Sequence, residues 1–361
     1  MKNIALFSLV MLFVISGCSP VLNQAEPTLT PIPTITNTPT LTPIPTITNT
    51  PTLTPTATRT PLPAISPLVE QLTPGQVVMH PFTENNPYVF YSYFPRSAVR
   101  EKNIVVGVWP HGGNMFNNDY EYHKDQAKNT ISWLKDYSEK YKIPLVVVAI
   151  PRVEQLYVHT IHPGTFSTTN EMLSRPDLKL IDAVWNQYIP SIKEAGFVTN
   201  DKVLMMGMSS PGIFTHRFAI LHPELIQAAW ECAEAAAPLP ASEMNGTQLD
   251  YPIGIRNLET LTGKAFDLET YLKIPQMICV GENDNKENND PTNSEIFPGW
   301  HWQYIKTNFG KTNPERVKFF YDYLVSIGTP AEFRLYKGVG HEITDEMMND
   351  AFQFLVSHSQ P

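Results

Sequence analysis

Short apolar runs alternate with longer amphipathic segments from about residue 75 onward, and this alternation constrains the fold most strongly. Two of the runs, IVVGVW at 104–109 and LVVVAI at 145–150, are apolar throughout. Such strands are buried on both faces, which predicts a mostly parallel sheet with helices on both sides, an α/β fold. We expect strands at 76–80, 88–93, 104–109, 145–150, 203–206, 226–230, 277–280 and 332–336, and helices at 121–142, 178–195, 214–221, 315–327 and 345–356.

The first residues have the composition of an export signal. Lys2 precedes an apolar run at 4–15, which is too short to cross a bilayer and is typical of a signal peptide. The run ends in ISGC at 15–18, which resembles the lipobox of bacterial lipoproteins. The resemblance implies that residues 1–17 are removed and that lipid on Cys18 holds the chain at the extracytoplasmic side of a membrane. A plain secretory signal is the alternative.

A proline-rich repeat follows the signal. Residues 27–38 read PTLTPIPTITNT, residues 39–50 read the same, and a third, altered copy begins at Pro51. Proline fixes φ and lacks a backbone donor, so neither a helix nor a sheet forms there. We therefore expect an extended stalk at 18–63 and a globular domain at 64–361.

Composition limits the partners of this globular domain. The formal net charge of −9 argues against nucleic acid, which is bound by clustered Lys and Arg. Cys232 and Cys279 are the cysteines left after Cys18, and we expect two buried thiols, with a disulfide as the alternative. No Cys or His pair has the spacing of zinc ligands, so no metal is expected. The sequence does not indicate the oligomeric state.

A candidate nucleophile follows the expected strand at 203–206. The segment GMSSPG at 207–212 places Ser209 between that strand and a helix. This segment resembles the nucleophile elbow of α/β hydrolases, Gly-x-Ser-x-Gly, in which small neighbours let strand and helix approach closely. Pro211 stands where the family has its second glycine, and Gly212 comes one position later. Ser210 is the alternative nucleophile.

Two glycines follow the expected strand at 104–109. The segment PHGGN at 110–114 resembles the His-Gly-Gly oxyanion loop of esterases. Free backbone N–H groups at Gly112, Gly113 or Asn114, together with that of Ser210, would stabilise a negative oxygen. The resemblance assigns His111 to support of the loop and not to proton transfer.

Candidates for the acid and the base follow the last two expected strands. Asp284 lies in GEND at 281–284, where the family has the acid of its triad, with Asp290 and Glu282 as alternatives. His341 lies in the glycine-flanked loop GVGHE at 338–342, which matches the family's general base. The chain order Ser209, Asp284, His341 is that of α/β hydrolases.

Together these motifs identify residues 75–358 as similar to the α/β-hydrolase superfamily, and within it to secreted polyhydroxybutyrate depolymerases and feruloyl esterases. The resemblance implies hydrolysis of a small or polymeric carboxylic ester through an acyl-enzyme, with no metal or organic cofactor. One alternative is a peptidase of the prolyl-oligopeptidase type, which shares the fold. The other alternative is a surface-binding module without catalysis.

Two insertions are candidates for shaping the pocket. Residues 238–275 interrupt the alternation after Trp230 and are a candidate lid. Residues 285–312 carry several aromatic side chains, among them Trp300 and Trp302. We expect these two rings either to contact an apolar or aromatic acyl group or to pack the loop against the domain.

Overall fold

The computed structural model describes residues 72–98, 103–113, 115–153, 156–234, 238–285 and 300–359. All of them belong to one compact unit, Pro61–Pro361. The expected signal peptide at 1–17, the lipidation residue Cys18, the stalk, Asn114 and Asp290 lie outside the described residues. None of the helices in the described ranges is both long enough and apolar enough to cross a membrane.

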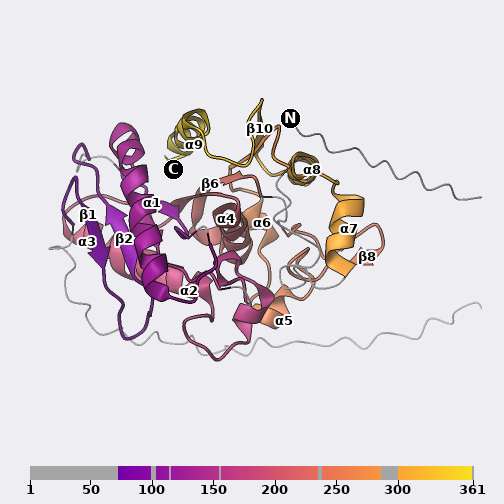
Figure 1. Ribbon diagram of the computed structural model, residues 1–361, viewed down its shortest axis with the longest axis horizontal. Helices are drawn as coiled ribbons and strands as arrows, with labels where there is room; N and C mark the ends of the chain where they lie inside the picture. Colours follow the sequence, from indigo (N-terminus) through magenta and orange to yellow (C-terminus); the bar gives the residue numbers. More distant parts are fainter. Residues whose placement is uncertain are drawn as a thin grey trace, which may run out of the picture. The chain divides into compact units, whose positions relative to one another are not determined.

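An eight-stranded, mostly parallel sheet forms the centre of this unit (Figure 1). Strand β2 runs antiparallel to both of its neighbours, β1 and β4, and the other neighbouring pairs are parallel. The strand order is β1-β2-β4-β3-β5-β6-β9-β10, with β1 at Val77–His80, β2 at Phe90–Tyr93, β3 at Gly107–Trp109, β4 at Leu145–Val148, β5 at Val203–Met208, β6 at Ile226–Cys232, β9 at Gln276–Gly281 and β10 at Ala331–Tyr336. Each predicted strand is present, with ends shifted by up to three residues.

Helices cover both faces of the sheet, as the apolar strands require. Helices α1 (Tyr120–Tyr141) and α9 (Asp345–Ser357) cover one face, and α4 (Ser210–Leu221) and α8 (Asn313–Ser326) cover the other. Figure 1 shows α1 lying across β1 and β2. Neighbouring positions along β4 alternate between the two cores, so that Val146 and Val148 face one and Leu145 and Val147 face the other. This alternation is the period of a strand and explains why every residue of β4 is apolar.

The segment predicted as one helix at 178–195 has three parts. An α-helix, α2 (Pro176–Ile181), continues into a π-helical stretch, η4 (Asp182–Tyr188), and then into α3 (Ile189–Glu194). Pro190 lacks an N–H, and its ring would clash with the carbonyl four residues earlier in a regular helix. The N–H of Ile189 accordingly bonds five residues back, to the carbonyl of Val184.

The two cysteines form a disulfide and are not the free thiols that we expected. Cys232 and Cys279 are in register on the parallel strands β6 and β9, with Cα atoms 4.5 Å apart. Side chains at paired positions point to the same face, so the two sulfurs meet in the core. A separation of 47 residues in sequence gives no sign of this register.

The candidate lid at 238–275 packs against the core through buried apolar side chains. Leu249 and Tyr251 are buried, and the Tyr251 hydroxyl donates a hydrogen bond to the carbonyl of Ile161 at 2.5 Å. This segment contains β7 (Glu243–Met244), β8 (Thr247–Gln248), α5 (Leu258–Thr262) and α6 (Leu268–Tyr271). The other short elements are α7 (Trp300–Asn308), η2 (Val158–Thr160), η3 (Pro163–Phe166) and η5 (Pro223–Leu225).

Candidate active site

Ser209 occupies a sharp turn between strand β5 and helix α4. Its backbone has φ 60° and ψ −125°, a conformation that is costly for any residue other than glycine. Two hydrogen bonds hold it: the N–H of Ser209 donates to the carbonyl of Cys232 at 2.8 Å, and its own carbonyl accepts from the N–H of Ile213 at 2.9 Å. Strain at one serine, held by the surrounding structure, is typical of a nucleophile elbow.

The small residues around Ser209 are a steric requirement. A Cβ atom at Gly207 would lie 2.3 Å from the carbonyl carbon of Pro211, so strand and helix would have to separate. Pro211 itself lies in the first turn of α4, where its missing N–H costs no helical hydrogen bond. The helix begins at Ser210, four residues before its predicted start, and Ser210 keeps the N–H group that an oxyanion site needs.

Asp284 and His341 form a hydrogen-bonded pair. The Nδ1–H group of His341 donates to Oδ2 of Asp284 at 2.9 Å. Asp284 is fully buried, and the Nδ2 group of Asn313 donates to the same carboxylate oxygen at 2.8 Å. Two donors on one buried carboxylate fix its position, and the carboxylate in turn fixes the orientation of the imidazole.

Asn313 was not among the residues predicted from the sequence. It is the first residue of α8, directly after Thr312, whose side chain accepts a hydrogen bond from the N–H of Glu315 in a capping box. The sequence TNPE at 312–315 is a clear signal for the start of a helix. Nothing in that signal indicates that the amide reaches Asp284 across the edge of the sheet.

Of the two alternative acids, Glu282 is the one that the structure describes. Glu282 is exposed, and its Oε2 atom accepts a hydrogen bond from the N–H of Gly338 at 2.9 Å, so it braces the turn after β10. Asp290 lies outside the described residues. Asp284 is therefore the acid that the fold brings to His341.

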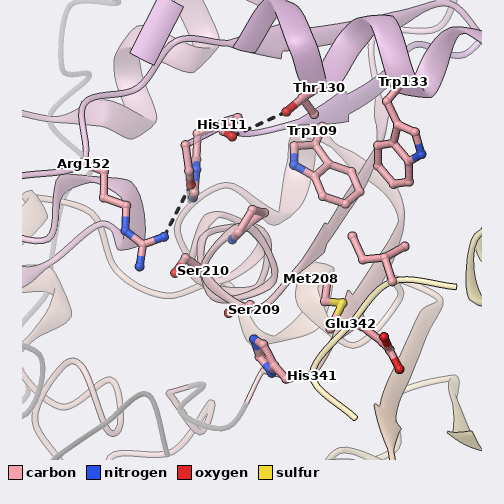
Figure 2. A pocket seen from close by; sticks show the side chains of 14 residues that line it. Trp109, His111, Thr130, Trp133, Arg152, Met208, Ser209, Ser210, His341 and Glu342 are labelled. Atoms are coloured by element: carbon pink, nitrogen blue, oxygen red, sulfur yellow. Dashed lines mark hydrogen bonds between the residues drawn. The ribbon is translucent and has the colours of Figure 1, made fainter. Parts of the chain in front are cut away.

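Ser209 and His341 line one cavity of about 380 Å³. Figure 2 shows the imidazole of His341 directed toward Ser209. The cavity is further lined by Trp109, His111, Gly112, Gly113, Thr130, Trp133, Arg152, Met208, Ser210, Pro211, Glu342 and Ile343. Residues that follow four strands, β3, β4, β5 and β10, thus converge at one edge of the sheet, where the parallel strands predicted a ligand site.

The glycine loop after β3 is oriented by contacts to its carbonyl groups. The Thr130 hydroxyl approaches the Gly112 carbonyl at 3.5 Å, and Nη1 of Arg152 approaches the Gly113 carbonyl at 3.4 Å (Figure 2). A Cβ atom at Gly112 would lie 2.6 Å from the backbone of Ala127 in α1, so only glycine permits this packing. Gly112, Gly113 and Ser210 all line the cavity, where their N–H groups are candidate donors to an oxyanion.

His111 has the surroundings of a supporting residue. It is fully buried, and burial together with the nearby charge of Arg152 lowers the pKa of its imidazole to about 3. An imidazole with so low a pKa stays neutral near pH 7 and is a poor proton acceptor. These surroundings agree with the support role that the resemblance gave to His111.

Trp300 and Trp302 are not among the residues that line this cavity. Trp302 is buried in the core, with the guanidinium of Arg316 5.0 Å from its ring, and Trp300 is exposed. Two other tryptophans form the apolar wall instead: Trp109 at the end of β3 and Trp133 in α1, with ring centroids 6.1 Å apart. Trp109 lies inside a predicted strand and Trp133 on a predicted helix, so only tertiary packing reveals their shared role.

No protein-family model matches this sequence, and no curated protein matches it. Among solved structures, poly(aspartic acid) hydrolase-1 from Sphingomonas sp. KT-1 is similar with a TM-score of 0.54 and 17% identity, over 79% of this chain and 100% of that chain. The poly(3-hydroxybutyrate) depolymerase LpqC from Bordetella parapertussis is similar with a TM-score of 0.52 and 15% identity, over 81% of this chain and 91% of that chain. With the strand order, these similarities show that the chain has the α/β-hydrolase fold.

Proposed function

We propose that this protein hydrolyses a carboxylic ester through an acyl-enzyme, with Ser209 as nucleophile, His341 as general base and Asp284 as the acid of the triad. The observation that carries the proposal is the hydrogen bond of 2.9 Å between His341 and a buried Asp284, with His341 lining the same cavity as a strained serine. One of the two similar structures carries the name of a poly(3-hydroxybutyrate) depolymerase, an enzyme that acts on an ester polymer, which supports ester hydrolysis. The other carries the name of a poly(aspartic acid) hydrolase and supports hydrolysis in general.

The proposed reaction follows from these positions. The Ser209 hydroxyl gives its proton to Nε2 of His341 as its oxygen attacks the ester carbonyl, and the imidazolium is stabilised by Asp284. The carbonyl oxygen becomes negative and accepts hydrogen bonds from the Ser210 N–H and from the glycine loop. His341 then protonates the leaving alcohol, and water attacks the acyl-enzyme by the same steps in reverse.

We also propose that the protein acts outside the cytoplasm, held to a membrane by lipid on Cys18. The disulfide between Cys232 and Cys279 supports this location, because disulfides persist in oxidising compartments and are rare in the cytoplasm. Growth with a radiolabelled fatty acid tests the anchor: label should enter the wild-type protein and be absent from Cys18→Ser. Equal labelling of both proteins would contradict it.

A fluorophosphonate probe tests the catalytic proposal. We expect covalent labelling of the wild-type protein, loss of labelling in Ser209→Ala, and retention in Ser210→Ala, whose backbone N–H is unchanged. Loss only in Ser210→Ala would move the nucleophile by one residue. Absence of labelling in the wild type would favour the binding module.

Substrate panels separate esterase from peptidase. We expect hydrolysis of short nitrophenyl esters and none of a proline amide, because no recognition domain for peptides is present among the described residues. Faster turnover of the amide than of the esters would favour the peptidase.

A further inference from the structure

Arg152 contributes a positive charge to the same cavity as Ser209. It follows β4 by four residues, and its guanidinium lies beside the glycine loop (Figure 2). Three contacts position it: Nη1 lies 3.4 Å from the Gly113 carbonyl, the guanidinium lies 4.8 Å from the centre of the Phe116 ring, and the backbone nitrogen lies 3.2 Å from Nε2 of His123. A planar guanidinium held in this way is preorganised to bind an oxyanion.

No carboxylate pairs with Arg152 among the residues that the structure describes. Its Nε–H group is buried and has no hydrogen-bond partner in the described part of the chain. Among the other arginines in these ranges, Arg175 pairs with Asp177 at 2.7 Å and Arg334 pairs with Glu332 at 2.9 Å. The fully buried Arg217 has no such acid among the described residues and donates to the Thr160 carbonyl, but unlike Arg152 it does not line the cavity. A desolvated cation without a paired acid is costly, so a site of this kind is expected to gain its counter-charge from a ligand.

The histidines near Arg152 do not supply a negative or competing charge. His111, His123 and His159 have lowered pKa values because burial disfavours their charged forms, and the charge of Arg152 lowers them further. The carboxylate that lines the cavity is Glu342, an exposed residue that Figure 2 shows far from Arg152, beyond His341. Among the described residues, the Arg152 end of the cavity is therefore positive.

The position of Arg152 relative to the triad decides which half of the ester it faces. Under the proposed function, His341 protonates the leaving alcohol, so the alcohol lies on the His341 side of Ser209. Figure 2 shows Ser209 and Ser210 between His341 and Arg152. An acyl half that extends from Ser209 away from His341 therefore faces Arg152.

We propose that Arg152 is a specificity-determining residue that binds a carboxylate on the acyl group of the substrate. The inference rests on the proposed function and deepens it: the preferred substrates are esters of acids that carry a second carboxylate, such as half-esters of dicarboxylic acids. A planar guanidinium can bind both oxygens of a carboxylate through two N–H groups at once.

Two esters of equal size test the proposal. Monomethyl succinate carries a carboxylate, and methyl succinamate carries a neutral amide at the same position; monomethyl glutarate and its amide extend the acyl chain by one carbon. Hydrolysis is followed by proton release at constant pH near neutrality. The readout is the ratio of kcat/KM for the acid to kcat/KM for the amide, because a general loss of activity leaves this ratio unchanged.

We expect the wild-type ratio to be about tenfold or more, the gain typical of a charge-assisted pair in a partly buried site. Arg152→Met keeps a long side chain without the charge and should bring the ratio below one, since the carboxylate then enters the site without a partner. Arg152→Lys keeps the charge and should retain part of the preference. Arg334→Met, at an exposed arginine, is the matched control and should keep the wild-type ratio.

Three results would overturn the inference: a wild-type ratio near one, equal losses on both esters in Arg152→Met, or a preference that appears only when the carboxylate is moved to the alcohol half. Equal losses would mean that Arg152 only braces the Gly113 carbonyl. Turnover of the amide with no preference for the acid would reject this inference and leave the esterase proposal standing. No turnover of any ester and no probe labelling would reject the proposed function itself.

Discussion

At the scale of single residues, burial separates two carboxylates that the sequence places two positions apart. Asp284 is fully buried and receives hydrogen bonds from His341 and Asn313, whereas Glu282 is exposed and accepts one from a backbone N–H group. A buried carboxylate with two donors stays fixed, and that rigidity is what an imidazole needs to keep one orientation. Removal of the charge is therefore expected to affect kcat strongly at Asp284 and little at Glu282.

Asp284→Asn should lower kcat by about 10³- to 10⁴-fold, because an amide cannot stabilise the imidazolium and can hold the ring in the wrong tautomer. Glu282→Gln is the matched control, since it is a similar change in the same loop, and it should alter kcat by no more than about threefold. Steady-state kinetics on a nitrophenyl ester measure both. Comparable losses in the two variants would show that the loop as a whole, and not the contact with His341, supports catalysis.

At the scale of elements, the disulfide joins the two strands that support the nucleophile and the acid. The carbonyl of Cys232, at the end of β6, accepts a hydrogen bond from the N–H of Ser209. Cys279 lies on β9, which leads into the loop of Asp284. The cross-link thus fixes the spacing between two parts of the site that come from distant segments of the chain.

Cys232→Ala/Cys279→Ala should lower the free energy of unfolding by about 2–4 kcal/mol, because the unfolded chain gains the freedom of a long open loop. The sequence separation of 47 residues places the expected loss toward the upper part of that range. Urea unfolding of the wild type, with and without a reducing agent, and of the double variant measures the change. Identical unfolding midpoints in all three samples would mean that the cross-link does not form in solution.

At the scale of the whole molecule, the domain keeps several histidines neutral by burying them. Burial lowers the pKa of His80, which stacks on Phe90, to about 4, and it is the main cause that lowers the pKa of His111 to about 3. An unfolded chain gives these side chains the ordinary pKa of about 6.5. The unfolded state therefore binds protons at a higher pH than the folded state does.

The free energy of unfolding should fall as the pH is lowered from about 6.5 toward about 4, because protons bind preferentially to the unfolded chain in this window. Above about pH 6.5 the contribution of the neutral histidines is complete. His80→Gln removes one of these groups. Between about pH 6.5 and about pH 4 the variant should lose less free energy of unfolding than the wild type does, by up to about 3 kcal/mol near pH 4. Urea unfolding across the window measures both slopes, and parallel slopes would show that His80 does not contribute.

Much of this protein follows from local sequence. The continuous apolar runs determine buried parallel strands, as the alternate burial of Val146 and Val147 shows, and the small residues around Ser209 determine a tight turn between strand and helix. These features depend on side-chain size and on periods of two or 3.6 residues, which are properties of neighbours along the chain. The order of the motifs then placed Asp284 and His341 after neighbouring strands.

Only the tertiary structure decided which distant groups touch. The pairing of Cys232 with Cys279 depends on strand register, and the contact of Asn313 with Asp284 depends on how α8 packs at the edge of the sheet. The cavity wall is built from Trp109 and Trp133, and Arg152 reaches it from the end of β4. Such contacts join residues far apart in sequence, and their geometry is determined by the packing of the whole core and not by any local pattern.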